Sequence, residues 1–131
     1  MKYLHYMRQK EDDCPAINYD VKLLEKLKNS LSYELTIDQE KAIRDILADL
    51  KAHFAMNRLL QGEVGSGKTI VAIMTILATV SGGYQAALMC PTEILSKQHY
   101  DTLRSQLEPF DNINIALLTG STPLKEKRQI L

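Results

Sequence analysis

The sequence predicts an α/β domain in which a parallel β-sheet is flanked by helices. From residue 35 onward, short apolar runs alternate with segments of helical periodicity. The runs are mainly apolar rather than alternating, as expected of strands covered on both faces. A glycine-rich turn, GEVGSGKT (62–69), joins one such run to a helix. Strands connected through helices imply right-handed βαβ crossovers and therefore a parallel sheet.

The composition is that of an ordinary globular domain. Of the 131 residues, 45% are hydrophobic and 24% are charged, and sixteen Lys and Arg balance sixteen Asp and Glu. This balance argues neither for nor against binding of nucleic acid, and any such contact would be local and rely largely on backbone amides. No signal-peptide core, membrane-spanning run or cysteine framework is apparent. We therefore expect a cytoplasmic protein that does not associate with membranes.

Residues 1–34 are expected to form a helical linker that precedes the motif-bearing domain at 35–131. The linker is rich in charge, and Pro15 divides it into two helical pieces. In the second piece, apolar residues recur at helical spacing between Val21 and Leu31, and Asp20 suits the N-cap. One face of this helix is expected to dock on the domain.

The elements of the domain follow in order along the chain. Thr36 and Gln39 form a capping-box pattern, which predicts that a helix begins after Thr36. Pro123 suits the first turn of a final helix. Between them, strands are expected over 58–61, 86–90 and 113–118, and helices over 68–80 and 92–107.

The glycine-rich turn fits the pattern G-x-x-x-x-G-K-[ST] at every fixed position. Backbone N–H groups in such a turn form a nest for phosphate oxygens, and the following helix directs its positive dipole end at the same place. Lys68 is expected to neutralise phosphate charge, and the Thr69 hydroxyl to bind Mg²⁺. We therefore expect a bound nucleoside triphosphate with Mg²⁺. The expected contacts are Gly62, Glu63, Val64, Gly65, Ser66, Gly67, Lys68 and Thr69.

Alternatives to this interpretation are an unliganded glycine-rich turn and a small kinase or GTPase. The strand and helix expected on either side of the turn favour phosphate binding over the first. The second is disfavoured because the chain has no Asn-Lys-x-Asp guanine signature and no Arg-rich lid segment.

Other polar groups are candidates for ligand contact. The amide of Gln39 can offer both a donor and an acceptor to the edge of adenine, but it also fits the second position of the capping box. The turns at 91–93 and 119–121 each follow an expected strand, and so lie at the sheet edge where open α/β folds bind ligands. Each could equally be an ordinary polar turn.

Taken in order, four segments resemble the first motor domain of superfamily 2 helicases: LTIDQ (35–39), LLQGEVGSGKT (59–69), MCPTEIL (89–95) and LLTGST (117–122). Within this group, MNRLLQGEVGSGKT and ALMCPTEILSKQHY are most similar to the RecG-type ATP-dependent DNA helicases. The resemblance covers about residues 18–131. The motor of transcription-repair coupling translocases is the nearest alternative, but a Tyr is usual there at the position of Ser66.

The resemblance implies a RecA-like motor fold that binds ATP and Mg²⁺ and acts on branched DNA, including fork regression and Holliday junction processing in recombination and repair. It implies catalytic roles for Lys68 and Thr69 and adenine recognition by Gln39. Tyr33 would be an aromatic neighbour of the base, or else a core or linker contact. The residues expected along the DNA strand are Pro91, Thr92, Glu93, Thr119, Gly120 and Ser121.

An acidic pair for hydrolysis is not found. Helicases of this group carry an Asp-Glu pair at the end of a later strand, and no such pair follows an apolar run after Lys68. The acidic run EDD at 11–13 has no strand before it. We therefore expect a truncated motor domain that binds nucleotide but does not hydrolyse ATP or unwind DNA alone. A non-catalytic nucleotide-binding module is the alternative, and an exposed sheet edge is expected to favour self-association.

Overall fold

The computed structural model describes residues 14–130. The chain divides into two compact units, residues 1–86 and 87–131, and each is described by itself. The helical piece expected before Pro15 and the acidic run at 11–13 lie outside the described residues. The boundary expected after residue 34, between a helical linker and the motif-bearing domain, stays a prediction.

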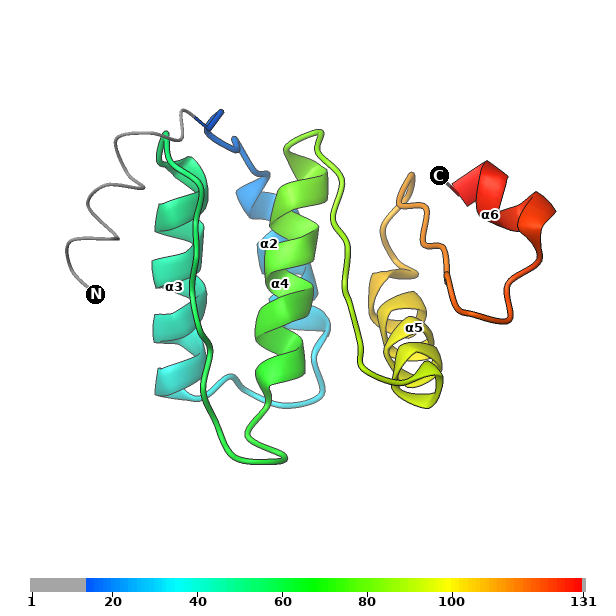
Figure 1. Ribbon diagram of the computed structural model, residues 1–131. Coiled ribbons are helices and arrows are strands. Elements are labelled where there is room, and N and C mark those ends of the chain that lie inside the picture. Colours follow the sequence, from blue (N-terminus) through cyan, green and yellow to red (C-terminus); the bar gives the residue numbers. More distant parts are fainter. Residues whose placement is uncertain (1–13, 131) are drawn as a thin grey trace. The chain divides into compact units, whose positions relative to one another are not determined.

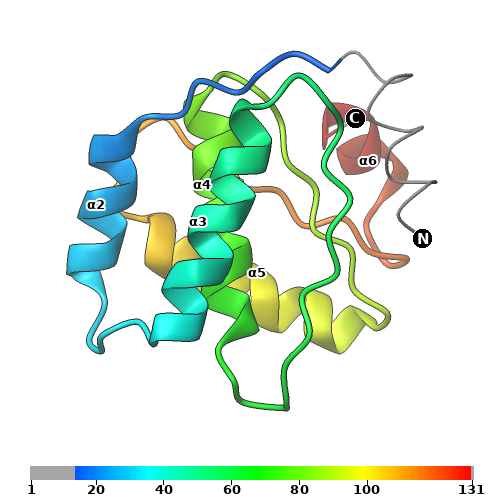
Figure 2. The ribbon, with the colours of Figure 1, turned by 90° about the vertical axis from the view of Figure 1, so that its left-hand side faces the viewer.

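Three helices form the core of the first unit: α2 (Val21–Ser30), α3 (Ile37–Lys51) and α4 (Lys68–Ser81) (Figures 1 and 2). Helix α4 contacts both α2 and α3. It is apolar on more than one side, as expected of a helix with two packed neighbours. The buried side chains of this unit are Leu24, Leu27, Ile43, Ile46, Ile70, Val71, Ile73, Met74, Leu77 and Ala78.

The helix starts expected from the sequence are confirmed. The carboxylate of Asp20 accepts a hydrogen bond from the Lys22 N–H at 2.9 Å, which caps α2. At α3, the Thr36 hydroxyl accepts from the Gln39 N–H at 3.2 Å, and the Gln39 side-chain oxygen accepts from the Thr36 N–H at 2.9 Å. This reciprocal pair is the capping box, and it satisfies two N–H groups that the helix itself cannot.

An ion pair connects α2 with α3. Lys28 Nζ lies 2.5 Å from Glu40 Oε1, and this contact lowers the pKa of the Glu40 carboxyl. Both side chains are partly exposed, so the pair contributes little at high ionic strength.

The segment that precedes α2 is attached to the C-terminal ends of the other two helices. The Ile17 N–H donates to the carbonyl oxygen of Leu50 at 2.8 Å, and the Asp20 N–H donates to the Ser81 hydroxyl at 3.0 Å. A Cβ on Gly82 would lie 2.6 Å from a methyl group of Ile17, so the absence of a side chain at residue 82 permits this approach. The linker is therefore packed onto the end of α4.

The second unit contains α5 (Glu93–Leu107) and α6 (Leu124–Ile130). Helix α5 begins as expected, because the Thr92 hydroxyl accepts from the Leu95 N–H at 3.3 Å. Pro123 directly precedes α6, and its carbonyl oxygen accepts from the Lys127 N–H at 2.9 Å. The buried apolar side chains of this unit are Leu107 and Phe110.

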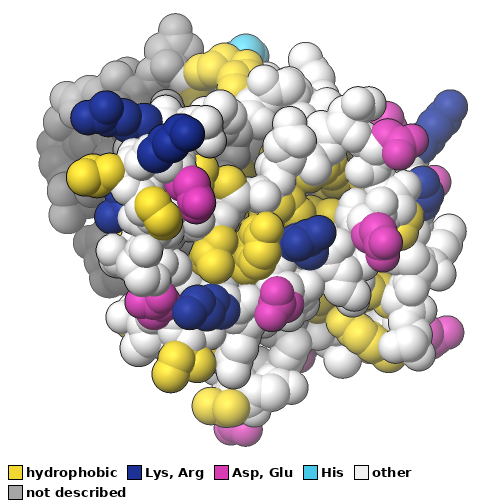
Figure 3. All heavy atoms as spheres, turned by 90° about the vertical axis from the view of Figure 1, so that its right-hand side faces the viewer, with side chains coloured by type: hydrophobic (Ala, Val, Ile, Leu, Met, Phe, Trp, Pro, Cys, Tyr) yellow, Lys and Arg dark blue, Asp and Glu magenta, His cyan; other side chains and the backbone are white. Residues whose placement is uncertain are grey.

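The expected parallel sheet is not formed within residues 14–130, where no strand is assigned. The segments 58–61, 86–90 and 113–118 run without regular pairing. A strand exists only when a neighbour in the right register accepts and donates its backbone hydrogen bonds, and the composition of one segment cannot supply that neighbour. Apolar side chains consequently remain at the surface: Leu59 is 82% exposed and Met89 is 92% exposed. Figure 3 shows exposed hydrophobic side chains among charged ones.

One irregular segment of the first unit is attached to a helix. Arg58 Nε donates to Asp49 Oδ2 at 2.5 Å, which joins the segment before the glycine-rich turn to α3, and this contact raises the pKa of Arg58.

No helix within the described part of the chain is both long enough and apolar enough to span a membrane.

Candidate functional site

The glycine-rich turn forms a tight loop between an irregular segment and α4. Gly65 and Gly67 have φ angles of 80° and 79°, in the left-handed region that an L side chain rarely adopts. The Ser66 N–H donates to the carbonyl oxygen of Glu63 at 3.1 Å and closes the turn. The conformation of the loop therefore depends on the two glycines.

Gly62 permits the loop to fold back on itself. A Cβ at residue 62 would lie 2.4 Å from Ser66 Oγ and 3.5 Å from Lys68 Cδ. Any side chain at residue 62 would collide with Ser66, which approaches Gly62 closely in the folded loop. A close approach at a glycine of this kind is a feature of loops that bind phosphate oxygens through their backbone N–H groups.

Helix α4 begins at Lys68, immediately after Gly67, and its first turn has no side-chain cap. The first N–H groups of a helix have no partner within the helix, and the positive end of the helix dipole lies at the same place. At α2, α3 and α5, an Asp or Thr side chain occupies this position. At α4 the amides remain available to an anion.

The Lys68 side chain folds back over the loop. Its ammonium group donates to the carbonyl oxygens of Gly62 and Glu63, the second at 3.2 Å. Thr69 is exposed in the first turn of α4, and its hydroxyl has no hydrogen-bond partner within residues 14–130. The ammonium group of Lys68 and the free hydroxyl of Thr69 therefore lie at the uncapped start of α4.

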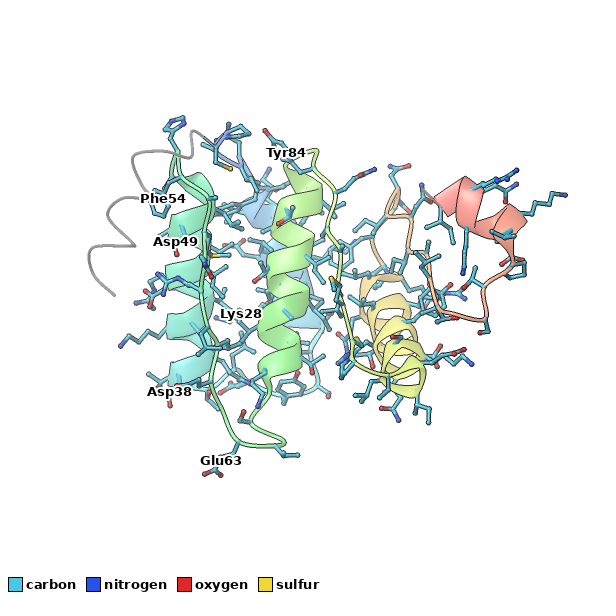
Figure 4. The ribbon with its side chains drawn as sticks, in the orientation of Figure 1. Lys28, Asp38, Asp49, Phe54, Glu63 and Tyr84 are labelled. Atoms are coloured by element: carbon cyan, nitrogen blue, oxygen red, sulfur yellow. The ribbon has the colours of Figure 1, made fainter. Side chains whose placement is uncertain are left out.

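Glu63 and Val64 contribute backbone rather than side chains to the loop. Figure 4 shows Glu63 at the end of the loop, with its side chain pointing away from α3 and α4. Val64 is fully exposed. Of the residues expected to contact a nucleotide, these two thus offer only their backbone groups.

The Gln39 side chain links the start of α3 to the loop. Its amide nitrogen donates to the carbonyl oxygen of Gly67 at 3.2 Å and lies 3.4 Å from that of Ser66. Its oxygen is the one that completes the capping box. The sequence suggests adenine recognition or capping for this residue, but its contact with the loop 28 residues away has no signature in the sequence.

Tyr33 lies at the surface of the first unit. Its side chain is 52% exposed and lines an open cavity of about 770 Å³ together with Lys28, Leu35 and Glu40. It is therefore not a core residue, and the cavity that it lines extends to the residues before α3.

A second polar cluster lies in the other unit, where the turns at 91–93 and 119–121 meet. Ser121 Oγ donates to Glu93 Oε1 at 2.5 Å, and Lys97 Nζ lies 3.3 Å from the same oxygen. Thr119 Oγ1 lies 3.0 Å from Ser121 Oγ. These hydrogen bonds, led by the one from Ser121, lower the pKa of the Glu93 carboxyl.

The remaining expected DNA-contacting residues lie in the same two turns. Pro91 is exposed, and the Thr92 hydroxyl is used in capping α5. Gly120 is exposed, with open space where a Cβ would lie. All six residues expected to contact DNA thus belong to one unit, and all those expected to bind nucleotide belong to the other.

Residues 36–131 match the family model described as DEAD/DEAH box helicase. The chain is 50% identical over 121 residues to ATP-dependent DNA helicase RecG of Aquifex aeolicus, which covers 92% of this chain and 15% of the relative. It is 53% identical over 109 residues to the protein of the same name from Borreliella burgdorferi, covering 83% of this chain and 16% of the relative.

A solved structure, described as RecG bound to a three-way DNA junction, superimposes with a TM-score of 0.82 at 42% identity. The match covers 98% of this chain and 17% of the solved one. The chain thus spans less than a fifth of the length of the relatives named here, at 15%, 16% and 17%. The structural likeness and the family match together indicate a RecA-like fold.

Proposed function

The chain belongs to the DEAD/DEAH box helicase family, and from this membership we propose that it is the nucleotide-binding part of an ATP-dependent DNA helicase acting on branched DNA. The phosphate loop at 62–69 is the observation that carries the proposal, because its shape fits a polyphosphate. The similarity to RecG proteins at 50% and 53% identity favours this activity over a transcription-repair coupling translocase.

We propose that the loop binds ATP together with Mg²⁺. The close approach at Gly62 and the uncapped start of α4 suit the phosphate oxygens. Lys68 would leave the loop carbonyl groups and neutralise phosphate charge, and the Thr69 hydroxyl would be a protein ligand of Mg²⁺. Bound Mg²⁺ would supply charge neutralisation across the phosphates. Within residues 14–130 no group of three or more His, Cys, Asp or Glu side chains could hold a metal ion, so the Thr69 hydroxyl is the protein ligand proposed among these residues.

The proposed DNA contacts lie in the second unit. Pro91, Thr92 and Glu93 on one turn and Thr119, Gly120 and Ser121 on the other would lie along the phosphate backbone of one DNA strand. The near-zero net charge of the chain supports a contact made through local amides rather than a basic surface. The solved relative was described as bound to a three-way DNA junction, which supports branched DNA as the partner.

We further propose that 58–61, 86–90 and 113–118 become parallel strands of the complete motor domain. Their exposed apolar side chains, such as Leu59 and Met89, support burial against neighbouring elements. Unpaired segments of this kind also favour association between chains. Sedimentation velocity is expected to show concentration-dependent association, and a monomer at all concentrations would contradict it.

The nucleotide proposal is tested by titrating a fluorescent ATP analogue with Mg²⁺ into the wild-type chain and into Lys68→Ala. We expect the substitution to weaken binding by about tenfold or more, because charge-assisted contacts to phosphate are worth roughly 1.5–3 kcal/mol. Lys41→Ala is the matched control, since Lys41 is an exposed lysine of α3. Equal affinities of wild type and Lys68→Ala would refute the proposal.

A further inference from the structure

Hydroxyl groups in the turn at 119–122 form a continuous chain that ends on the Glu93 carboxylate. Thr122 Oγ1 accepts from the Thr119 N–H at 2.9 Å and lies 3.3 Å from Thr119 Oγ1. Thr119 Oγ1 lies 3.0 Å from Ser121 Oγ, which donates to Glu93 Oε1 at 2.5 Å. The chain therefore passes through three hydroxyl groups and joins the turn to the first residue of α5.

The carboxylate fixes the direction of every hydrogen bond in this chain. An ionised carboxylate only accepts, so the single hydroxyl proton of Ser121 must go to Glu93. Ser121 Oγ then accepts the proton of Thr119, and Thr119 Oγ1 accepts that of Thr122. All three hydroxyl protons are thereby used within the cluster.

The donors left to a ligand are backbone groups. Within the described part of the chain, the N–H groups of Gly120 and Ser121 have no hydrogen-bond partner, and both residues are exposed. The Thr119 and Thr122 N–H groups are used inside the turn. A phosphate oxygen needs donors, so the backbone of residues 120 and 121 is the part of the turn that suits it.

We propose that Glu93 is a positioning residue: its carboxylate orients the hydroxyl groups of the 119–122 turn, which then presents the Gly120 and Ser121 N–H groups to a nucleic-acid phosphate. This inference rests on the proposed function for its ligand. It changes the role of Glu93 within that function, because a carboxylate in direct contact with phosphate would repel it.

The local charges agree with an orienting role. Lys97 is the charged group that faces the Glu93 carboxylate, 3.3 Å away on the next turn of α5. Together with Ser121 it keeps Glu93 ionised and partly offsets its charge. The pair is an i,i+4 pair with Glu on the N-terminal side, which is the favourable order on a helix.

The first test follows the chain in the absence of nucleic acid. In a pH titration by ¹H–¹⁵N NMR, the Thr119 and Ser121 amide signals are expected to shift with a midpoint below the ordinary glutamate value of about 4.3. Glu93→Gln should abolish that transition, while the amide signals of the buried residues Leu107 and Phe110 report that the second unit stays folded. Amide signals that do not respond to Glu93 would overturn the orienting role, whether or not nucleic acid binds.

The second test measures binding of a fluorescein-labelled single-stranded oligothymidylate by anisotropy. Glu93→Ala removes the acceptor, and we expect roughly 3- to 10-fold weaker binding. Glu93→Gln keeps an oxygen acceptor for Ser121, and binding should stay within about twofold of wild type. Glu108→Gln, which makes the same charge change at the other end of α5, controls for long-range electrostatics.

A double-mutant cycle separates orientation from direct contact. If Glu93 acts through Ser121, Ser121→Ala should weaken binding as Glu93→Ala does, and the double variant should be no weaker than either. Additive losses, or tighter binding by both Glu93 variants, would overturn the proposal. If the wild-type chain does not bind the oligonucleotide, the phosphate contact is refuted, and the NMR titration still decides the role of Glu93 in the free chain.

Discussion

The side-chain nitrogen of Gln39 lies 3.2 Å from the carbonyl oxygen of Gly67, and it occupies the space that a side chain at residue 67 would need. A Cβ on Gly67 would lie 2.0 Å from that nitrogen. One amide thus holds the phosphate loop against the start of α3 while it also closes the capping box. Gln39 therefore joins the phosphate loop to the start of α3.

Gly67→Ala is expected to abolish binding of the ATP analogue and to lower the free energy of unfolding by about 1–3 kcal/mol. The substitution places an L side chain at a φ of 79°, and the added Cβ displaces the Gln39 amide from the carbonyl oxygen of Gly67. Gly83→Ala is the matched control, because Gly83 has a φ of 87° but nothing within 4 Å of an added Cβ. Urea unfolding and fluorescence titration would measure both effects, and nucleotide affinity lost equally in the two variants would contradict the explanation.

Gln39→Ala distinguishes support of the loop from recognition of the base. If the amide acts on the loop, the variant should bind inorganic tripolyphosphate and ATP with similarly reduced affinity, about 3- to 10-fold below wild type. If the amide reads adenine instead, only ATP binding should weaken. Isothermal titration calorimetry with both ligands decides between the two roles. Circular dichroism would report the separate cost of losing the hydrogen bond from the Thr36 N–H, since the Thr36 hydroxyl still caps α3 in this variant.

Thr69→Val tests the proposed metal ligand. Wild-type affinity for the ATP analogue should fall when Mg²⁺ is removed by EDTA, whereas the affinity of Thr69→Val should depend much less on Mg²⁺. Thr75→Val is the control on the same helix, since the Thr75 hydroxyl donates to the carbonyl oxygen of Val71 within α4. A full Mg²⁺ response in Thr69→Val would remove this residue from the site.

Stability should depend on pH through the Glu40–Lys28 pair. The pKa of Glu40 is lowered in the folded chain, so its contribution is present above the unfolded value of about 4.3 and is lost as pH falls through the folded value. The free energy of unfolding of wild type should exceed that of Glu40→Gln at neutral pH, and the difference should vanish in acid. Glu25→Gln, an exposed carboxylate on α2, is the control. A difference independent of pH would rule out the ion pair as its cause.

Local features of the fold could be predicted from the sequence. Asp20 and Thr36 cap helices as expected, because a cap depends on residues two or three positions apart. The expected sheet is not formed within the described residues, because strand pairing depends on residues far apart in the sequence. An apolar run such as 86–90 indicates a preference for burial, but a strand also needs a partner whose position the run does not encode.

The candidate sites show the same contrast. Gly65 and Gly67 adopt the left-handed backbone that a glycine-rich phosphate loop requires. The contacts of Gln39 with Gly67 and of Glu93 with Ser121 were not foreseen, because each joins side chains or backbone 28 residues apart. Spacing along the chain indicates which residues carry the chemistry, and only the folded arrangement shows which of them support the others.

The attachment of residues 17–20 to the far end of α4 has a mechanical consequence. Helix α4 is 14 residues long, so it is a rod of about 21 Å at 1.5 Å per residue. Its first residue borders the phosphate loop, and its last, Ser81, accepts the hydrogen bond from Asp20. A tilt of α4 at its phosphate-loop end would shift Ser81 at the opposite end, and with it the residues bonded to Ser81. Any tilt of α4 that accompanied occupancy of the loop would therefore move residues 17–20 as well.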